Sequence, residues 1–209
     1  MQKKYVFILI LVALLAGTIV AVNPAFNNNE QELKSQVADN ELVTEGDTTA
    51  EAFKWYQMKE ALALQEKTGK KMFIDVYTTW CGPCKMLEAN TFSNPVIQKL
   101  LSEYYIPTKF NAECGDTVVF KGQTFMNRNY TPTPRKSTHD FAVYIASTQQ
   151  GLGYPTMVFL DSSLNMIQPI SGYLVPGQLE PILSFFGTDA YKTTDWETYY
   201  KGFTSQISQ

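Results

Sequence analysis

The hydrophobic pattern begins with a long apolar run at the N-terminus. Two lysines, Lys3 and Lys4, precede an apolar stretch over residues 5–22 that is interrupted only at Gly17-Thr18. A basic start followed by an apolar run is typical of a secretory signal peptide or an N-terminal membrane anchor. The run is close to the ~18–20 residues of a membrane span, so its length does not decide between the two. In either case we expect the rest of the chain to be exported.

Residues 23–50 show the opposite pattern, because they are polar and acidic. Six acidic residues stand against a single basic residue, Lys34. Such a segment cannot bury enough apolar surface to offset the entropy lost on ordering. We therefore expect a disordered acidic tether, followed by a folded domain over residues 51–187.

Within residues 51–187, short apolar strands alternate with segments of helical period, which predicts an α/β fold. Strands are expected over residues 53–55, 72–76, 108–111, 157–160 and 166–171. Helices are expected over residues 58–68, 96–104, 140–149 and 176–186, with a further one directly after Trp80.

Glycine, proline and capping residues place several of these boundaries. Gly69 is expected to end the first helix, and Asn94 with Pro95 to begin the helix over residues 96–104. Because proline cannot donate to a central ladder, the middle strand is expected to start after Pro107. For the same reason, Pro169 limits its strand to a sheet edge.

Residues 115–137 are the most irregular part of the domain. Val118–Phe125 has the pattern of a β-hairpin with its turn at Lys121-Gly122, and Ser137 or Thr138 is expected to cap the following helix. Long loops in compact domains are usually functional or disordered. We expect this segment to be a hairpin insertion that selects partners and does not support the fold. Residues 188–209 are expected to form a C-terminal helical extension that packs back on the domain.

Composition excludes some classes of function. The chain has 209 residues, 44% of them hydrophobic, which is typical of a globular protein. Its net charge is -3 and no basic block or stripe occurs, which argues against a nucleic-acid partner. One histidine and three cysteines leave little material for a metal site.

The candidate chemistry lies where the strand over residues 72–76 leads into a helix. Cys81 and Cys84 are spaced i, i+3, with Gly82 and Pro83 between them. Cys81 is expected at the helix N-terminus, where unpaired N–H groups and the helix dipole stabilise a thiolate. Cys84 falls one turn further on the same face. The spacing therefore predicts an exposed nucleophile, Cys81, with a shielded resolving partner, which is the arrangement needed for thiol–disulfide exchange.

Other interpretations of the cysteines remain open at this point. A CxxC pair also occurs in structural disulfides and in zinc sites, and Cys114 with His139 could complete a Cys3His set. Zinc pairs normally come as two matched clusters, however. Cys114 is either a small buried residue or a third redox thiol. His139 is expected at the surface.

Residues 80–85 read WCGPCK, which resembles the active-site motif of the thioredoxin superfamily. The order of elements from Phe53 to Phe186 is similar to the thioredoxin fold, a central mixed sheet flanked by helices. Residues 88–95 look more like the thioredoxin-like domain of the DsbD membrane disulfide reductases and their exported relatives.

The resemblance implies roles for individual residues. Asp75, six residues before Cys81, matches a buried carboxylate that could take up the proton of Cys84. Lys109 resembles the partner of that carboxylate, with a plain surface lysine as the alternative. Pro155 matches a cis-proline facing the dithiol, and the backbone near Tyr154 is expected to pair with the client. The residues expected to form the client surface beside the dithiol are Trp80, Gly82 and Pro83.

The implied function is that of an exported thiol–disulfide oxidoreductase. The Gly-Pro linker is that of reducing members, so the resemblance favours reduction of disulfides in client proteins, without a cofactor. A membrane thiol reductase is the implied electron donor, in the periplasm or at the outer face of the inner membrane. The alternatives are a disulfide oxidase or isomerase, and a non-catalytic client- or metal-binding module.

Overall fold

The computed structural model describes residues 52–207. The expectations for residues 1–22 and 23–50 lie outside the described residues. Within residues 52–207, no helix has both the length and the apolar character needed to cross a membrane.

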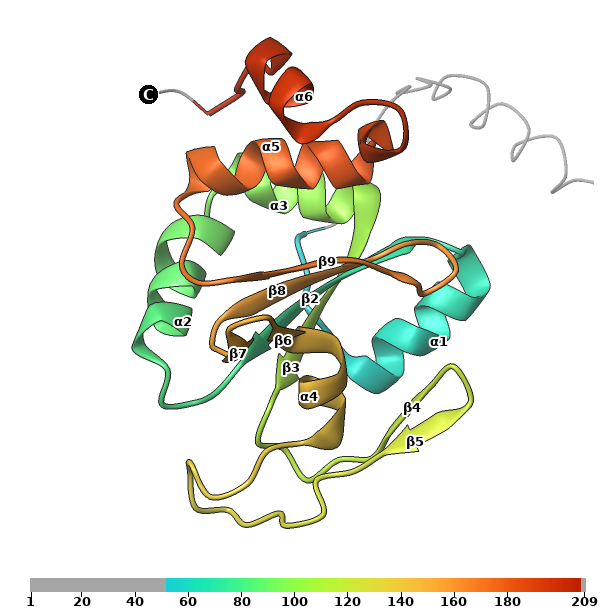
Figure 1. Cartoon of the computed structure of the whole chain (residues 1–209), viewed down its shortest axis with the longest axis vertical. Coiled ribbons are helices and arrows are strands. Elements are labelled where there is room, and N and C mark those ends of the chain that lie inside the picture. Colours follow the sequence, from blue (N-terminus) through green and yellow to red (C-terminus); the bar gives the residue numbers. More distant parts are fainter. Residues whose placement is uncertain (1–51, 208–209) are drawn as a thin grey trace, which may run out of the picture. The chain divides into compact units, whose positions relative to one another are not determined.

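The centre of the fold is a five-stranded sheet with the strand order β1-β3-β2-β8-β9 (Figure 1). β1 and β2 run parallel to β3, whereas β8 runs antiparallel to β2 and to β9. The predicted central mixed sheet is therefore confirmed, and β9 lies at an edge, as its proline requires. The strands are β1 (Tyr56–Gln57), β2 (Lys71–Tyr77), β3 (Tyr105–Asn111), β8 (Thr156–Leu160) and β9 (Met166–Ser171).

Helices cover both faces of the sheet. Successive side chains of a strand point to opposite faces, so Ile74 of β2 packs toward one layer and Phe73 toward the other. The layer on the Ile74 face contains α1 (Met58–Thr68) and α4 (Asp140–Ala146). The layer on the Phe73 face contains α2 (Gly82–Met86), the π-helical turn η1 (Leu87–Phe92), α3 (Pro95–Tyr104) and α5 (Pro176–Gly187).

Two helices have the boundaries that their end signals predict. α1 ends before Gly69, which has φ +63° and donates its N–H to the carbonyl of Gln65 at 2.7 Å. α3 begins at Pro95, and Oδ1 of Asn94 accepts the N–H of Val96 at 2.9 Å. Both signals act over a few residues, so they hold whatever the rest of the chain does.

Two strand predictions are wrong. Residues 53–55 form no strand, because the rings of Phe53 and Trp55 pack into the aromatic cluster on the Phe73 face; β1 begins at Tyr56 instead. The middle strand includes Pro107, which pairs with Phe73 of β2. β1 pairs with β3 only at Thr108 and Lys109. Pro107 therefore faces no neighbouring strand on the β1 side, where its missing N–H removes no hydrogen bond between strands.

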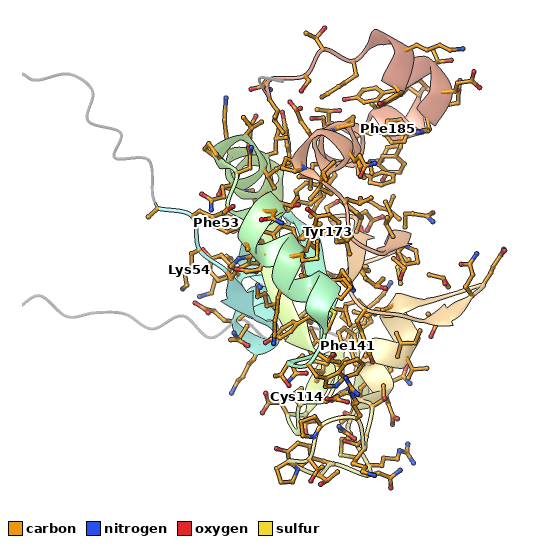
Figure 2. The ribbon with its side chains drawn as sticks, turned by 90° about the vertical axis from the view of Figure 1, so that its left-hand side faces the viewer. Phe53, Lys54, Cys114, Phe141, Tyr173 and Phe185 are labelled. Atoms are coloured by element: carbon orange, nitrogen blue, oxygen red, sulfur yellow. A yellow bond between two sulfur atoms is a disulfide. The ribbon has the colours of Figure 1, made fainter. Side chains whose placement is uncertain are left out.

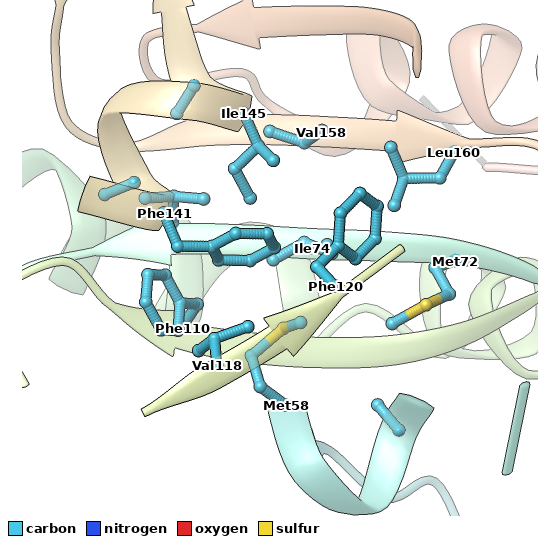
Figure 3. Packing of buried hydrophobic residues seen from close by; sticks show 14 of the residues in the cluster. Met58, Met72, Ile74, Phe110, Val118, Phe120, Phe141, Ile145, Val158 and Leu160 are labelled. Carbon is cyan, nitrogen blue, oxygen red and sulfur yellow. The ribbon is translucent and has the colours of Figure 1, made fainter. Parts of the chain in front are cut away.

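The segment after β3 contains a hairpin of β4 (Val118–Phe120) and β5 (Gln123–Phe125). Lys121 and Gly122 both have positive φ, as a two-residue turn of this kind requires. Figure 3 shows Val118 and Phe120 among the core side chains of α1 and α4. The expectation that this hairpin does not support the fold is therefore wrong, because its inner face belongs to the core.

α4 begins differently from the prediction. Its cap is His139, not Ser137 or Thr138, because Nδ1 of His139 accepts the N–H of Phe141 at 3.0 Å. The helix ends at Ala146 rather than at residue 149, and a small hairpin of β6 (Ser147–Thr148) and β7 (Gly151–Leu152) follows it.

His139 is buried, so its expected surface position is also wrong. Its Nε2 lies 2.7 Å from the carbonyl oxygen of Asp116, and its ring packs edge-on against Phe110. Since Nδ1 accepts a hydrogen bond, Nε2 carries the proton and donates it to that carbonyl. Both ring nitrogens are thus satisfied inside the fold.

After α5, a 3-10 turn, η2 (Ala190–Lys192), leads to α6 (Trp196–Gly202). The rings of Trp196 and Tyr199 lie 5.3 and 4.9 Å from that of Phe185 on α5, whose position Figure 2 marks. The side chain of Glu180 is buried, and its Oε1 accepts the N–H of Gln206 at 2.6 Å. A carboxylate of α5 thus fixes the chain beyond α6.

Candidate active site

The two cysteines of the motif lie at the start of α2, just beyond the C-terminal end of β2. Cys81 is the N-cap residue, Pro83 lies in the first turn, and Cys81 and Cys84 form a disulfide. Sγ of Cys81 accepts the N–H of Cys84 at 3.1 Å. A sulfur in this position receives the stabilisation that a helix N-terminus offers to negative charge.

The predicted contrast in exposure between the two cysteines is wrong for this disulfide form. Cys81 is 3% exposed and Cys84 is 7% exposed. The N-cap geometry turns Sγ of Cys81 onto the first helical turn, which withdraws it from solvent. Position at the helix end, and not exposure, therefore distinguishes the two residues.

Asp75 lies on β2 with its side chain on the same face as Phe73. The residue is 2% exposed, and burial raises the pKa of its carboxyl to about 7, against the lowering effect of Lys109. Its Oδ2 lies 3.6 Å from Nζ of Lys109. Its buried Oδ1 has no hydrogen-bond partner among residues 52–207. This carboxyl can therefore hold or release a proton near neutral pH.

Lys109 is the partner of Asp75 and not a plain surface lysine. The two residues are paired across β2 and β3, and the Lys109 side chain is only 20% exposed. Its ammonium also lies over the rings of Trp55 at 5.1 Å and Tyr77 at 5.4 Å. Aromatic faces attract a cation, so these rings hold the ammonium next to the carboxylate.

Glu88 is a member of this cluster that the sequence reasoning did not single out. Its Oε2 forms an ion pair with Nζ of Lys109, and its negative charge raises the pKa of Asp75 further. The available signal was spacing: Glu88 follows Cys84 by four residues in a continuous helical segment, which places both on one face. Lys109 is thus shared by two carboxylates.

The peptide bond between Tyr154 and Pro155 is cis, as the resemblance implied. The carbonyl of Pro155 accepts the N–H of Gly172 at 2.8 Å, and Gly172 has φ +105°, which favours glycine. The ring of Tyr154 meets that of Trp80 edge-on at 6.0 Å. The fold thus places the turn before β8 beside Trp80, the residue that precedes Cys81.

Trp80 makes two further contacts that the sequence did not indicate. Its Nε1 donates to Oε2 of Glu113 at 2.9 Å, and the guanidinium carbon of Arg135 lies 4.5 Å from the centre of its ring. Oε1 of Glu113 accepts the backbone N–H of Arg135 at 2.7 Å. No local pattern marks Arg135, because it reaches Trp80 only through the fold of the loop after β5.

Cys114 is a free thiol, partly exposed, and burial raises its pKa (Figure 2). Within residues 52–207, no group of three or more histidine, cysteine, aspartate or glutamate residues is arranged to hold a metal ion. The nitrogens of His139 are engaged by Phe141 and Asp116, so a zinc ion could bind His139 only by displacing at least one of these partners.

Comparison with known proteins identifies relatives. The family model described as a thioredoxin-like domain matches residues 58–187. The thiol:disulfide interchange protein DsbD of Salmonella typhi is 31% identical over 100 residues, covering 48% of this chain and 13% of that protein. DsbD of Citrobacter koseri is 28% identical over 155 residues, covering 72% of this chain and 21% of that protein. The match thus spans about a fifth or less of these relatives.

Solved structures with a similar arrangement include a thioredoxin from Thermus thermophilus, with a TM-score of 0.45 and 18% identity over 63% of this chain and 85% of that chain. The reduced C-terminal domain of DsbD from Neisseria meningitidis has a TM-score of 0.40 and 16% identity, over 60% of this chain and 89% of that chain.

The family match covers four of the five strands of the sheet (all but β1), both helical layers and the cysteine pair. The matched region contains the disulfide at the start of α2 and the cis-proline before β8. Together these features support thiol–disulfide oxidoreductase chemistry in general, without its direction or its substrates. The chain belongs to the thioredoxin-like family and is related to DsbD.

Proposed function

We propose that this chain is a protein-disulfide reductase that acts on exported client proteins. The observation that carries the proposal is the Cys81–Cys84 pair at the N-terminus of α2, backed by the buried Asp75 carboxyl. The Gly-Pro linker favours the reducing direction. The apolar run over residues 5–22 supports export, to the periplasm or the outer face of the inner membrane.

In the proposed reaction, the reduced chain first attacks with the Cys81 thiolate. Its Sγ bonds to one sulfur of a client disulfide, the client S–S bond breaks, and the other client sulfur leaves as a thiolate. The Cys84 thiolate then attacks Sγ of Cys81 and releases the second client sulfur. Two electrons pass to the client, and the chain is left with the Cys81–Cys84 disulfide.

Cys84 must lose its proton before it attacks, and Asp75 is the proposed acceptor. A carboxyl with a pKa of about 7 is ionised often enough to accept a proton and protonated often enough to return it. Lys109 is the proposed positioning residue for that carboxylate, since its ammonium stabilises the ionised form. Glu88 limits this effect because it pairs with the same ammonium.

The client is proposed to lie over Trp80, Gly82 and Pro83, and to pair with the backbone at Tyr154 and Pro155. Trp80 is partly exposed and lies against Tyr154, so the two rings form a surface beside the dithiol. Reduction consumes the dithiol, which must be restored by a thiol donor. The DsbD relatives are named for thiol–disulfide interchange, and we propose a membrane thiol reductase as the donor.

The activity is tested by insulin reduction with the full chain in neutral detergent and dithiothreitol as the electron source. We expect turnover by the wild type and none by Cys81→Ser, with Cys114→Ser as a matched thiol control that stays active. Turnover by Cys81→Ser would overturn the proposal.

The direction is tested by the reduction potential of the Cys81–Cys84 couple. A reductase is expected near the value of about -270 mV that thioredoxin has, whereas a value close to about -120 mV would favour a disulfide oxidase.

A further inference from the structure

The loop of residues 126–138, between β5 and α4, lies against the active-site surface. Two residues near the C-terminal end of the loop make the contacts. Arg135 lies over the Trp80 ring, and the Thr138 side chain lies close to that of Tyr154. The same loop therefore touches the two aromatic residues that flank the proposed client position.

The loop is held in place by specific bonds to the segment that follows β3. Nδ2 of Asn127 donates to the carbonyl of Cys114 at 3.1 Å, and the backbone N–H of Arg135 donates to Glu113 at 2.7 Å. The Tyr130 ring lies so close to Gly115 that a Cβ there would come within 3.0 Å of it. A cavity of about 330 Å³ remains between the loop and this segment, with Thr79 of the active-site turn at its wall.

The charge of the loop is cationic. It carries Arg128, Arg135 and Lys136 and no acidic residue. Arg128 pairs with Asp140 at 3.0 Å. Arg135, by contrast, takes part in none of the ion pairs found in residues 52–207. Its guanidinium can therefore accept an anionic partner from outside the chain.

The contact with Trp80 prepares Arg135 for such a partner. A guanidinium over an aromatic face is held in one plane, and its edge keeps N–H donors that match the two oxygens of a carboxylate. Glu113 holds both Trp80 and Arg135 in place. One of its carboxylate oxygens accepts the indole N–H of Trp80, and the other accepts the backbone N–H of Arg135.

We propose that Arg135 is a specificity-determining residue that favours client disulfides flanked by an acidic side chain. The inference rests on the proposed function, since it assumes that a client disulfide reacts with Cys81 beside Trp80. A client residue next to the reacting cysteine then lies within reach of the Arg135 guanidinium.

The test uses the reduced full chain in neutral detergent and three short peptide disulfides. The peptides differ only in the residue beside cysteine, which is Asp, Ser or Lys, and hydroxyethyl disulfide serves as an uncharged small substrate. The second-order rate constant of single-turnover reduction is measured for the wild type, Arg135→Gln, and Arg128→Gln as the control that removes a paired charge from the same loop.

We expect the wild type to reduce the Asp peptide about two- to fivefold faster than the Lys peptide, which lies within the range for one exposed ion pair. This preference should vanish in Arg135→Gln, persist in Arg128→Gln and shrink at about 1 M salt, where the Debye length is about 3 Å. Hydroxyethyl disulfide should react at similar rates with all three proteins, which also shows that the Arg135→Gln variant is folded.

Three results would overturn the inference: no preference in the wild type, a preference that persists in Arg135→Gln, or equal slowing of every substrate by that variant. Equal slowing would mean that Arg135 acts on the Cys81 thiol and not on the client. Failure of the wild type to reduce any substrate would overturn the proposed function itself, whereas reduction without preference overturns the inference alone.

Discussion

Nζ of Lys109 lies 3.6 Å from Oδ2 of Asp75, directly across the parallel pair of β3 and β2. The ammonium is not reserved for this carboxylate, since Glu88 binds it from the helix that follows the cysteines. Oδ1 of Asp75 is buried and has no partner within residues 52–207. Burial therefore outweighs ion pairing at this site and raises the pKa of Asp75 to about 7.

This balance predicts the pH dependence of stability. The pKa of Asp75 is raised in the folded state, so the fold binds its proton more tightly than the unfolded chain, whose value is near 3.8. The contribution to stability is present below about pH 4 and is lost as the pH rises through about 7. Asp75→Asn should remove this loss and raise the free energy of unfolding at pH 8 by roughly 2–4 kcal/mol.

The measurement is urea unfolding of the wild type and Asp75→Asn between pH 4 and 8. Glu88→Gln is the matched comparison, because it removes a negative charge that adds to the effect of burial on the Asp75 pKa. In this variant, the loss of stability with rising pH should occur at a lower pH than in the wild type. Parallel pH profiles for the wild type and Asp75→Asn would show that Asp75 does not titrate in this range.

The proposed roles of the cysteines predict a trapped intermediate. Cys84→Ser cannot complete the second exchange, so it should accumulate disulfides between Cys81 and client proteins. Non-reducing gels and mass spectrometry should find these adducts in Cys84→Ser and not in Cys81→Ser. Adducts that persist in Cys81→Ser would assign the attack to one of the two thiols that this variant retains, Cys84 or Cys114.

The hairpin is predicted to stabilise the fold. Phe120 is 3% exposed and its neighbour Val119 is 59% exposed on the same strand. Phe120→Ala removes a large core side chain and should lower the free energy of unfolding by about 3 kcal/mol. Val119→Ala is the control and should change it by less than about 0.5 kcal/mol. Similar small effects in both variants would mean that the hairpin is not part of the core.

The cap formed by His139 predicts a graded effect of substitution. His139→Ala loses the hydrogen bonds to Phe141 and Asp116 and should cost about 2 kcal/mol of stability at pH 7. His139→Asn should cost less, because asparagine is itself a good N-cap. Chemical unfolding of both variants provides the comparison, and equal losses would argue against the capping role.

The bond from Glu180 to the chain beyond α6 predicts local protection. Glu180→Ala should free the backbone N–H of Gln206 and expose the C-terminal residues to proteases and to hydrogen exchange. Glu197→Ala, which breaks an exposed ion pair with Lys201 on α6, should leave this protection unchanged. Peptide-level hydrogen exchange over residues 203–207 decides between the two outcomes.

The sequence by itself determined the features that depend on neighbouring residues. α1 and α3 have their predicted ends because Gly69 and Asn94 act within one helical turn. The position of Cys81 at a helix start follows in the same way from the strand and the Gly-Pro linker. Backbone preferences and capping bonds of this kind act over about four residues, so a linear pattern contains them.

Tertiary structure alone decided the features that join distant segments. The pairing of Lys109 with Asp75, the burial of His139 and Phe120, and the position of Arg135 over Trp80 each depend on how separate elements pack. Pro107 could enter β3 only because β1 is too short to reach it. Such contacts follow from the filling of shared space by side chains far apart in sequence, and no local signal encodes which of them meet.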